Sequence, residues 1–258
     1  AMLRRLELSI GDMGRIVDRA HARGMHAIVT PFSVELVDAA ERVGFDAYKT
    51  ASPDIIHKPL LERLAQTGKP LIVSTGAATI EEVARAALWL ASARDRTAFL
   101  QCVSSYPTRD AEASIGAMAA IARVWSGPVG YSDHTTGVDT GAAAAVRGAA
   151  ILEKHFTWSK RAAGPDHAAS LEPAEFRAYA TLARDESVMK AWMGSVPLSA
   201  DPRIGPEEKR VLPCEQDVRR LSRQSLVAAR HLPAGHVLRL EDLTIKRPGT
   251  GIEPFRIE

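Results

Sequence analysis

Two short stretches near the middle of the chain carry side chains that suit metal chemistry. They are Gly130-Tyr-Ser-Asp-His-Thr-Thr136 and Glu153-Lys-His-Phe156, and each follows a short apolar run. Ser132 lies two residues before His134 and Glu153 two residues before His155, so on a strand each pair shares a face. If the two runs are neighbouring parallel strands, both imidazoles lie at one end of a sheet and can hold one divalent metal with positions open for a substrate. A single histidine at a strand end is more often a hydrogen-bonding residue, but two with acidic neighbours favour the metal site.

Other strand ends carry groups that suit an anion. Lys49 is a fixed cation for phosphate or carboxylate, with Ser52 as a nearby donor; the alternative is a lysine that extends to solvent at the rim. The turn Ser74-Thr-Gly76 precedes a helix with a predicted capping box, which is compatible with a bound anion. Tyr106 follows a further strand, where it either hydrogen-bonds a substrate or forms a Tyr-Pro turn without a role.

These residues are carried by a regular alternation of strands and helices. The apolar runs predict strands at 25–30, 45–51, 70–74, 98–103, 129–131 and 150–153. Helical periodicity predicts helices at 9–23, 34–43, 58–67, 80–93, 115–124, 139–147 and 173–190. Strands separated by helices indicate parallel β/α units with right-handed crossovers.

A doubly wound sheet and a (β/α)8 barrel both fit this alternation, and the polar residues distinguish them. Such residues follow all six strands, among them Thr30, Lys49, Ser74, Ser104 and Ser132. A barrel builds its site from the C-terminal ends of many strands, whereas an open sheet concentrates it at one switch point. The pattern therefore favours the barrel.

The last part of the chain has a different character. Residues 1–193 form the predicted barrel domain, and residues 194–219, rich in Pro, Gly and charge, are predicted to be a linker. Residues 220–258 predict a small β-rich domain, which is too short for a strong core of its own and must dock on another surface.

Composition excludes several classes of function. The net charge is +2, with 33 basic and 31 acidic residues in mixed order, so neither nucleic acid nor an anionic membrane is expected as a partner. No apolar run reaches the length of a membrane span, and no secretory signal is expected. The two cysteines are far apart, which favours a reducing, cytoplasmic location over a disulfide framework.

Taken together, the motifs resemble those of one enzyme family. Besides the two histidine stretches they include Gly164-Pro-Asp-His-Ala-Ala-Ser-Leu-Glu-Pro173, Tyr48-Lys-Thr-Ala-Ser52, Val73-Ser-Thr-Gly76 and Ser105-Tyr-Pro-Thr108. Over nearly its whole length the chain resembles the sialic acid synthases and their legionaminate, pseudaminate and spore-coat polysaccharide relatives. Its C-terminal Arg223-Gln-Ser-Leu-Val-Ala and Lys246-Arg-Pro-Gly-Thr-Gly-Ile252 resemble the antifreeze-like (SAF) domain of that family.

The resemblance implies a reaction and a set of residues for it. The reaction is condensation of phosphoenolpyruvate with an N-acetylated hexosamine, such as N-acetylmannosamine, to a sialic-type nonulosonic acid with release of phosphate. A divalent metal, manganese first and magnesium as the alternative, is implied at His134 and His155. The implied catalytic residues are these histidines and Glu153, and the implied substrate-binding residues are Thr30, Lys49, Ser52, Ser74, Ser104, Tyr106, Ser132, Asp166 and Arg247. Arg247 is implied to reach the barrel of a second subunit, in a domain-swapped homodimer.

The chain also departs from the family pattern. Six strands are predicted where a (β/α)8 barrel has eight, so we expect that the first two β/α units are not part of this chain and that the SAF domain is short at its C-terminus. Ser104 stands where the best-known members have Asn. Two alternatives therefore remain beside the synthase: a catalytically silent member that binds metal and phosphoenolpyruvate, and a metal-dependent aldolase. Unpaired sheet edges predict self-association or impaired activity.

Overall fold

Six parallel strands form one sheet in the order of the sequence. The computed structural model describes residues 6–185, 187, 191 and 200–257. The strands are β1 (Ile28–Val29), β2 (Ala47–Thr50), β3 (Leu71–Ser74), β4 (Thr97–Cys102), β5 (Val129–Asp133) and β6 (Leu152–Lys154), and each pairs in parallel with the next. Among the described residues no strand joins β1 to β6, so the curled sheet is an open arc, as predicted for six of the eight strands of a barrel.

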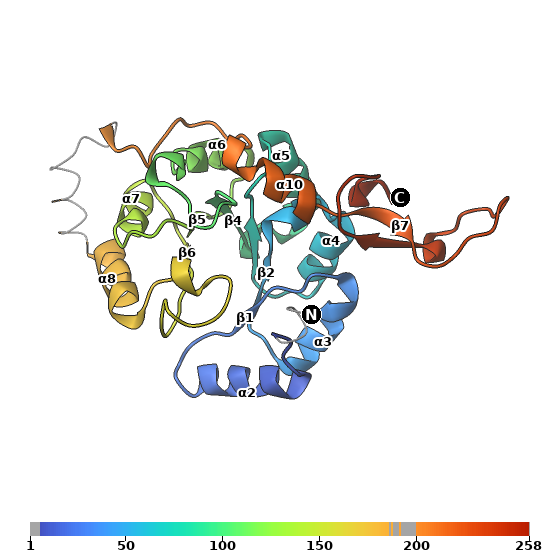
Figure 1. Cartoon of the computed structure of the whole chain (residues 1–258), viewed down its shortest axis with the longest axis horizontal. Coiled ribbons are helices and arrows are strands. Elements are labelled where there is room, and N and C mark those ends of the chain that lie inside the picture. Colours follow the sequence, from blue (N-terminus) through green and yellow to red (C-terminus); the bar gives the residue numbers. More distant parts are fainter. Residues whose placement is uncertain (1–5, 186, 188–190, 192–199, 258) are drawn as a thin grey trace.

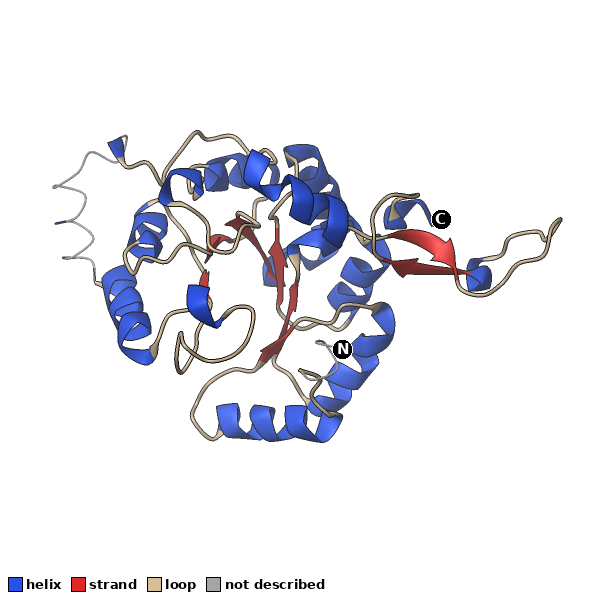
Figure 2. Cartoon of the chain, in the orientation of Figure 1, coloured by secondary structure: helices blue, strands red, loops and turns tan. Residues whose placement is uncertain are grey.

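Helices connect the strands and surround the sheet (Figures 1 and 2). They are α2 (Ile10–His21), α3 (Val34–Val43), α4 (Lys58–Gln66), α5 (Ile80–Trp89), α6 (Ala117–Val124), α7 (Thr140–Val146) and α8 (Pro173–Arg184). The predicted range 173–190 is longer than α8, and Glu186 and residues 188–190 lie outside the described part. All the other predicted helices exist, with ends shifted by a few residues.

Local chemistry explains where these helices begin and end. Ser9 and Asp12 form a capping box at the start of α2, and Thr79 and Glu82 form another at the start of α5. Gly44 ends α3 with φ of 89°, a left-handed conformation that favours glycine. These caps satisfy backbone groups that have no partner inside a helix.

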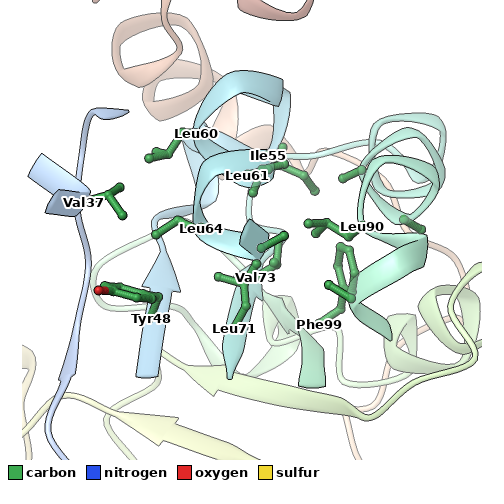
Figure 3. Close-up of a cluster of buried hydrophobic side chains, with 14 of the residues drawn as sticks. Val37, Tyr48, Ile55, Leu60, Leu61, Leu64, Leu71, Val73, Leu90 and Phe99 are labelled. Atoms are coloured by element: carbon green, nitrogen blue, oxygen red, sulfur yellow. The ribbon is translucent and has the colours of Figure 1, made fainter. Parts of the chain in front are cut away.

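The main core lies between the sheet and the helices outside it. Figure 3 shows Leu61 and Leu64 of α4 on the side of Leu71 and Val73 of β3, and Leu60 toward Val37 of α3; all of these side chains are buried. The spacing of the three leucines puts them on one face of α4. This core fixes the strands, and therefore the positions of the residues that follow them.

Residues 201–223, here called the strap, connect the arc to the C-terminal domain and lie on the arc. The strap passes over α6 and α5 and ends in α10 (Gln216–Ser222), drawn in orange in Figure 1. Backbone amides of Ile115 and Gly116 donate to the carbonyls of Arg203 and Ile204, at 3.0 and 2.6 Å. An added Cβ at Gly116 would lie 2.7 Å from the carbonyl oxygen of Gly205, so only glycine permits this close approach.

The C-terminal domain contains one small antiparallel sheet. It consists of β7 (Ser225–Ala228) and β8 (Leu243–Lys246), and it stands to the right of the arc in Figure 2. The second strand begins after residues 237–240, the Val-Leu-Arg-Leu stretch that the sequence analysis included in the β-rich unit. In the described part of the chain no helix combines the length and apolar character needed to cross a membrane.

Candidate active site

A cavity of about 440 Å³ opens at the C-terminal ends of the strands, where the sequence predicts the site. It is lined by all of the predicted site residues except Asp166, namely Thr30, Lys49, Ser52, Ser74, Ser104, Tyr106, Ser132, His134, Glu153, His155 and Arg247. Phe32, Ala51, Pro53, Cys102, Val218 and Ser222 complete the lining. The parallel register explains this convergence, because consecutive strands end at the same edge of the arc.

The two histidines lie side by side in this cavity. Their ring centres are 5.5 Å apart and the ring planes cross at 79°. Nδ1 of His134 lies 2.7 Å from the carbonyl oxygen of Val103, so it is the protonated nitrogen and donates to that carbonyl. Burial lowers the pKa of His134 to about 4, although the bond to Val103 opposes this shift. At neutral pH the ring is therefore uncharged, and the lone pair on Nε2 faces Oγ of Ser132 at 3.4 Å.

This pair fits a divalent cation. A metal–nitrogen bond of about 2 Å, with about 1 Å from nitrogen to ring centre, puts two imidazoles of one ion at most about 6 Å apart. Beside them, Oε2 of Glu153 is buried and accepts no hydrogen bond from the described residues. No group of three or more His, Cys, Asp or Glu side chains suited to a metal occurs in the described part. A metal at this position would be held by the two imidazoles of His134 and His155.

Small hydroxyl side chains and one lysine also line the cavity. Nζ of Lys49 donates to Oγ of Ser74 at 2.7 Å and lies 3.4 Å from Oε2 of Glu153. The amide of Gly76 donates to Oγ of Ser52 at 3.0 Å. We call Ser52, Ser74, Gly76, Ser104 and Ser132 the serine cradle; its four serines are buried. Hydroxyl donors beside a lysine ammonium suit an anion.

Gly76 leaves the cradle open because it has no side chain. A Cβ at this position would lie 2.2 Å from Oγ of Ser104 and 2.7 Å from Oγ of Ser52, which is closer than atoms can approach. The cradle therefore depends on glycine at the end of β3 and on hydroxyls contributed by the ends of neighbouring strands.

Three predicted residues lie at the rim or beyond it. The ring of Tyr106 packs on His134 with centres 4.3 Å apart and remains half exposed, so its hydroxyl is accessible. Asp166 is exposed in the loop after β6 and does not line the cavity. Arg247, next to β8, lines the cavity of its own chain, and the exchange between two subunits that the resemblance implies stays a prediction.

One acidic residue near the site was not identified from the sequence. Asp54 is fully buried in the turn after β2, and neither carboxylate oxygen has a hydrogen-bond partner among the described residues. Burial raises its pKa to about 7, against the opposing effect of Arg247, Arg223 and Lys49. The sequence signal was a lone carboxylate beside Ile55 and Ile56. Of the cations that act on it, Lys49 is near in the sequence, whereas Arg223 and Arg247 lie far away along the chain.

A second set of buried charges lies behind the serine cradle. Glu215 is fully buried, and its Oε1 accepts from the amides of Ala77 and Ser104 at 2.6 and 2.7 Å. Lys209 is also buried, and burial lowers its pKa, while Glu215 and Cys102 favour its charged form. Both belong to the strap, whose composition alone predicted only a linker.

The fold and the site are of the β/α-barrel type, with buried serine hydroxyls, one lysine and two adjacent histidines at the strand ends. Comparison with known proteins gives the family: residues 1–194 match the NeuB family and residues 223–257 match the SAF domain. The chain belongs to the NeuB family.

Individual relatives agree with this assignment. The chain is 33% identical over 260 residues to the N,N'-diacetyllegionaminic acid synthase of Campylobacter jejuni, covering 100% of this chain and 74% of the relative. A sialic acid synthetase structure from Leptospira borgpetersenii superposes with a TM-score of 0.67 at 28% identity, over 82% of this chain and 70% of that one. The spore coat protein SpsE of Bacillus subtilis shares the fold, with a TM-score of 0.86 at 24% identity, over 96% of this chain and 71% of that one.

Proposed function

We propose that this chain condenses phosphoenolpyruvate with an N-acetylated hexosamine, of the N-acetylmannosamine type, to a sialic-type nonulosonic acid and releases phosphate. The observation that carries the proposal is the meeting of an anion cradle and a paired-histidine centre in one cavity. Membership of a family whose relatives are named as nonulosonic acid synthases supports the same reaction type.

The cradle and Lys49 suit phosphoenolpyruvate. This substrate is a small dianion or trianion, and it needs several donors close together with at least one fixed positive charge. Ser52, Ser74 and Ser104 supply buried hydroxyls, and Lys49 supplies the charge from within bonding distance of Ser74. Held in this way, the C3 carbon of phosphoenolpyruvate faces the side of the cavity where the histidines lie.

The histidine side of the cavity suits the open-chain sugar. We propose that His134 and His155 hold manganese, with magnesium as the alternative. Bound there, the cation supplies Lewis-acid polarisation of the sugar aldehyde oxygen. Tyr106 at the rim and Arg247 from the C-terminal domain present donors to the polar groups of the hexosamine, and Asp166 is proposed to approach from the loop after β6.

In the proposed reaction, water supplies the new oxygen at C2 and the protons that the products carry. A carbon–carbon bond forms between C3 of phosphoenolpyruvate and the aldehyde carbon of the sugar, and the aldehyde oxygen gains a proton. Water adds to C2 and gives one proton to the former aldehyde oxygen. The bond from C2 to the bridging oxygen then breaks, the second proton of the water leaves with the phosphate, and C2 becomes a carbonyl. We propose that Oε2 of Glu153, which accepts no hydrogen bond from the described residues and lies 3.4 Å from Nζ of Lys49, accepts a hydrogen bond from that water.

Phosphate release tests the proposal. The full chain is incubated with phosphoenolpyruvate, N-acetylmannosamine and manganese, with and without a chelator, and both phosphate and the nonulosonic acid are measured. We expect both products in equal amounts and their loss with chelator. Binding of phosphoenolpyruvate in calorimetry without turnover would instead indicate the silent member, and a product without phosphate release would indicate the aldolase.

The histidines give the second test. His134→Ala and His155→Ala are each expected to weaken manganese binding at least about 100-fold. Loss of a residue that only hydrogen-bonds a metal ligand already weakens binding by up to about 100-fold, and loss of a ligand itself should cost no less. Calorimetry with manganese measures this even without turnover. His231→Ala, at an exposed position of the C-terminal domain, is the matched control and should bind as wild type does. Unchanged manganese affinity in either of the first two variants contradicts the assignment.

A further inference from the structure

The two histidines of the cavity directly follow the neighbouring strands β5 and β6, and the residue before each histidine is charged: Asp133 before His134, and Lys154 before His155. We propose that Asp133 and Lys154 form a buried ion pair that positions the two imidazoles for one metal ion. The inference rests on the proposed function, because it concerns how the proposed metal site is held. Its test measures metal binding and does not depend on turnover.

The ion pair lies on the face of the sheet opposite to the cavity. In the parallel register of β5 and β6, Ser132 lies beside Glu153, and Asp133 lies beside Lys154. Ser132 and Glu153 line the cavity. Since successive side chains of a strand point to opposite faces, Asp133 and Lys154 point away from the cavity, toward the helices that cover the sheet.

Lys154 binds the chain on both sides of His134. Its Nζ donates to Oδ2 of Asp133 at 2.9 Å and also to the carbonyl oxygen of Thr135. The amide and the hydroxyl of Thr135 both donate to Oδ1 of Asp133, each at 2.8 Å. The two neighbours of His134 are therefore tied to each other and to the residue that precedes His155.

The ion pair is shielded from water. The side chain of Lys154 is 1% exposed and that of Asp133 is 0% exposed. Nζ of Lys154 lies 5.4 Å from the ring centre of Tyr179 on α8, and an added Cβ at Gly141 of α7 would lie 2.4 Å from the same ring. Separation of the two charges in this layer is unfavourable, because it leaves each one buried without a partner.

The strand that carries His155 has few other interactions that fix its position. Strand β6 has three residues, and in the described part of the chain it pairs only with β5. Groups that bind one metal ion must keep their positions to within about 0.5 Å. The ion pair joins the last residue of β5 to the last residue of β6, so it fixes the two points from which the histidines extend.

A double substitution separates positioning from stability. Asp133→Asn combined with Lys154→Met removes both charges, so that neither is left alone in the core, and the amide oxygen of the asparagine can still accept from Thr135. We expect the double variant to fold, as urea unfolding verifies. In calorimetry its affinity for manganese should be lower than that of wild type by about 10-fold or more, the lower end of the range for residues that support metal ligands.

Asp201→Asn combined with Arg203→Met is the matched control. These two residues also form a buried ion pair, at 2.8 Å, and neither belongs to the described lining of the cavity. Loss of this pair perturbs the fold in a comparable way, but we expect the affinity for manganese to remain that of wild type.

Two outcomes overturn the inference: a folded Asp133→Asn/Lys154→Met variant that binds manganese as wild type does, and an equal loss of affinity in the control. If the double variant does not fold, Asp133→Asn alone decides, because it keeps the size of both side chains. A loss of manganese affinity in that variant supports the positioning role, and unchanged affinity refutes it.

The histidine variants distinguish this failure from failure of the proposed function. If His134→Ala and His155→Ala weaken manganese binding but the removal of the ion pair does not, the metal site stands and only the positioning role is wrong. If the histidine variants also bind manganese as wild type does, the proposed metal site is wrong and the inference falls with it.

Discussion

The buried carboxylate of Asp54 makes the stability of the protein depend on pH. Its pKa is raised by burial from the ordinary 3.8 to about 7, so between these values the folded chain holds a proton that the unfolded chain releases. The free energy of unfolding therefore falls as the pH rises through this range. The fall is up to about 1.4 kcal/mol per pH unit, or about 4 kcal/mol in all.

Asp54→Asn removes this dependence, because the amide does not ionise. We expect the variant to gain stability relative to wild type between pH 5 and pH 8, by a few kcal/mol at most, on the order of the loss it avoids. Urea unfolding at the two pH values measures it. Asp217→Asn is the control, since that side chain is exposed. If the free energy of unfolding of Asp54→Asn differs from that of wild type by the same amount at both pH values, Asp54 does not titrate in this range.

Gly76 is the residue on which the shape of the serine cradle depends. In Gly76→Ala the new Cβ must displace Ser104 and Ser52, so we expect a loss of about 1–3 kcal/mol in stability and weaker binding of phosphoenolpyruvate. Gly14→Ala is the matched control, because Gly14 lies in α2 with nothing within 4 Å of an added Cβ. That substitution should stabilise by about 0.5–1 kcal/mol. Urea unfolding distinguishes the two signs, and equal effects would contradict the crowding of Gly76.

At the scale of elements, the sequence predicted what depends on local pattern. The range 34–43 was predicted for α3, and the structure has Val34–Val43, because an amphipathic stretch between Ser33 and Gly44 defines both ends. The six strands and their order followed from the same periodicity. The last strand was predicted at 150–153 but is Leu152–Lys154, since the pairing with β5 decides where it begins.

The strap has buried charged residues that the local sequence pattern did not predict. Its composition predicted a linker, but Glu215 and Lys209 are buried, and the amides that Glu215 bridges, at Ala77 and Ser104, lie more than a hundred residues earlier in the chain. Asp54 is also buried, and two of the cations that act on its pKa, Arg223 and Arg247, come from distant parts of the chain. The histidines and serines of the candidate site were identified because strand ends converge in any parallel barrel, whereas their roles in a reaction remain predictions.

The buried carboxylate of Glu215 leads to a prediction about how the strap is attached to the arc. Glu215→Ala leaves three buried amides without an acceptor, each costing about 1–3 kcal/mol before relaxation, so we expect a loss of several kcal/mol in the free energy of unfolding. Glu208→Ala, at an exposed strap position, is the control and should stay within about 0.5 kcal/mol of wild type. A loss in Glu215→Ala no larger than in the control would mean that the strap is not anchored there.

At the scale of the whole molecule, the arc leaves the outer edges of β1 and β6 without a partner strand among the described residues. Large apolar side chains are exposed at both edges: Ile28 within β1, and Phe156 and Trp158 after β6. Unpaired strand edges with apolar neighbours are surfaces through which chains associate.

We therefore expect the chain to associate with itself through these edges in a concentration-dependent way, measurable by analytical ultracentrifugation. Ile28→Lys combined with Trp158→Lys puts a charge at each edge and should shift association to higher concentration, because burying two lysines without partners is unfavourable. Leu88→Lys is the matched control: this residue is 76% exposed on α5, comparable with the 73% of Trp158, but lies on the outer helical layer. If Leu88→Lys reduces association as much as the double variant does, the contact is made through the helices and the open edges are protected in another way.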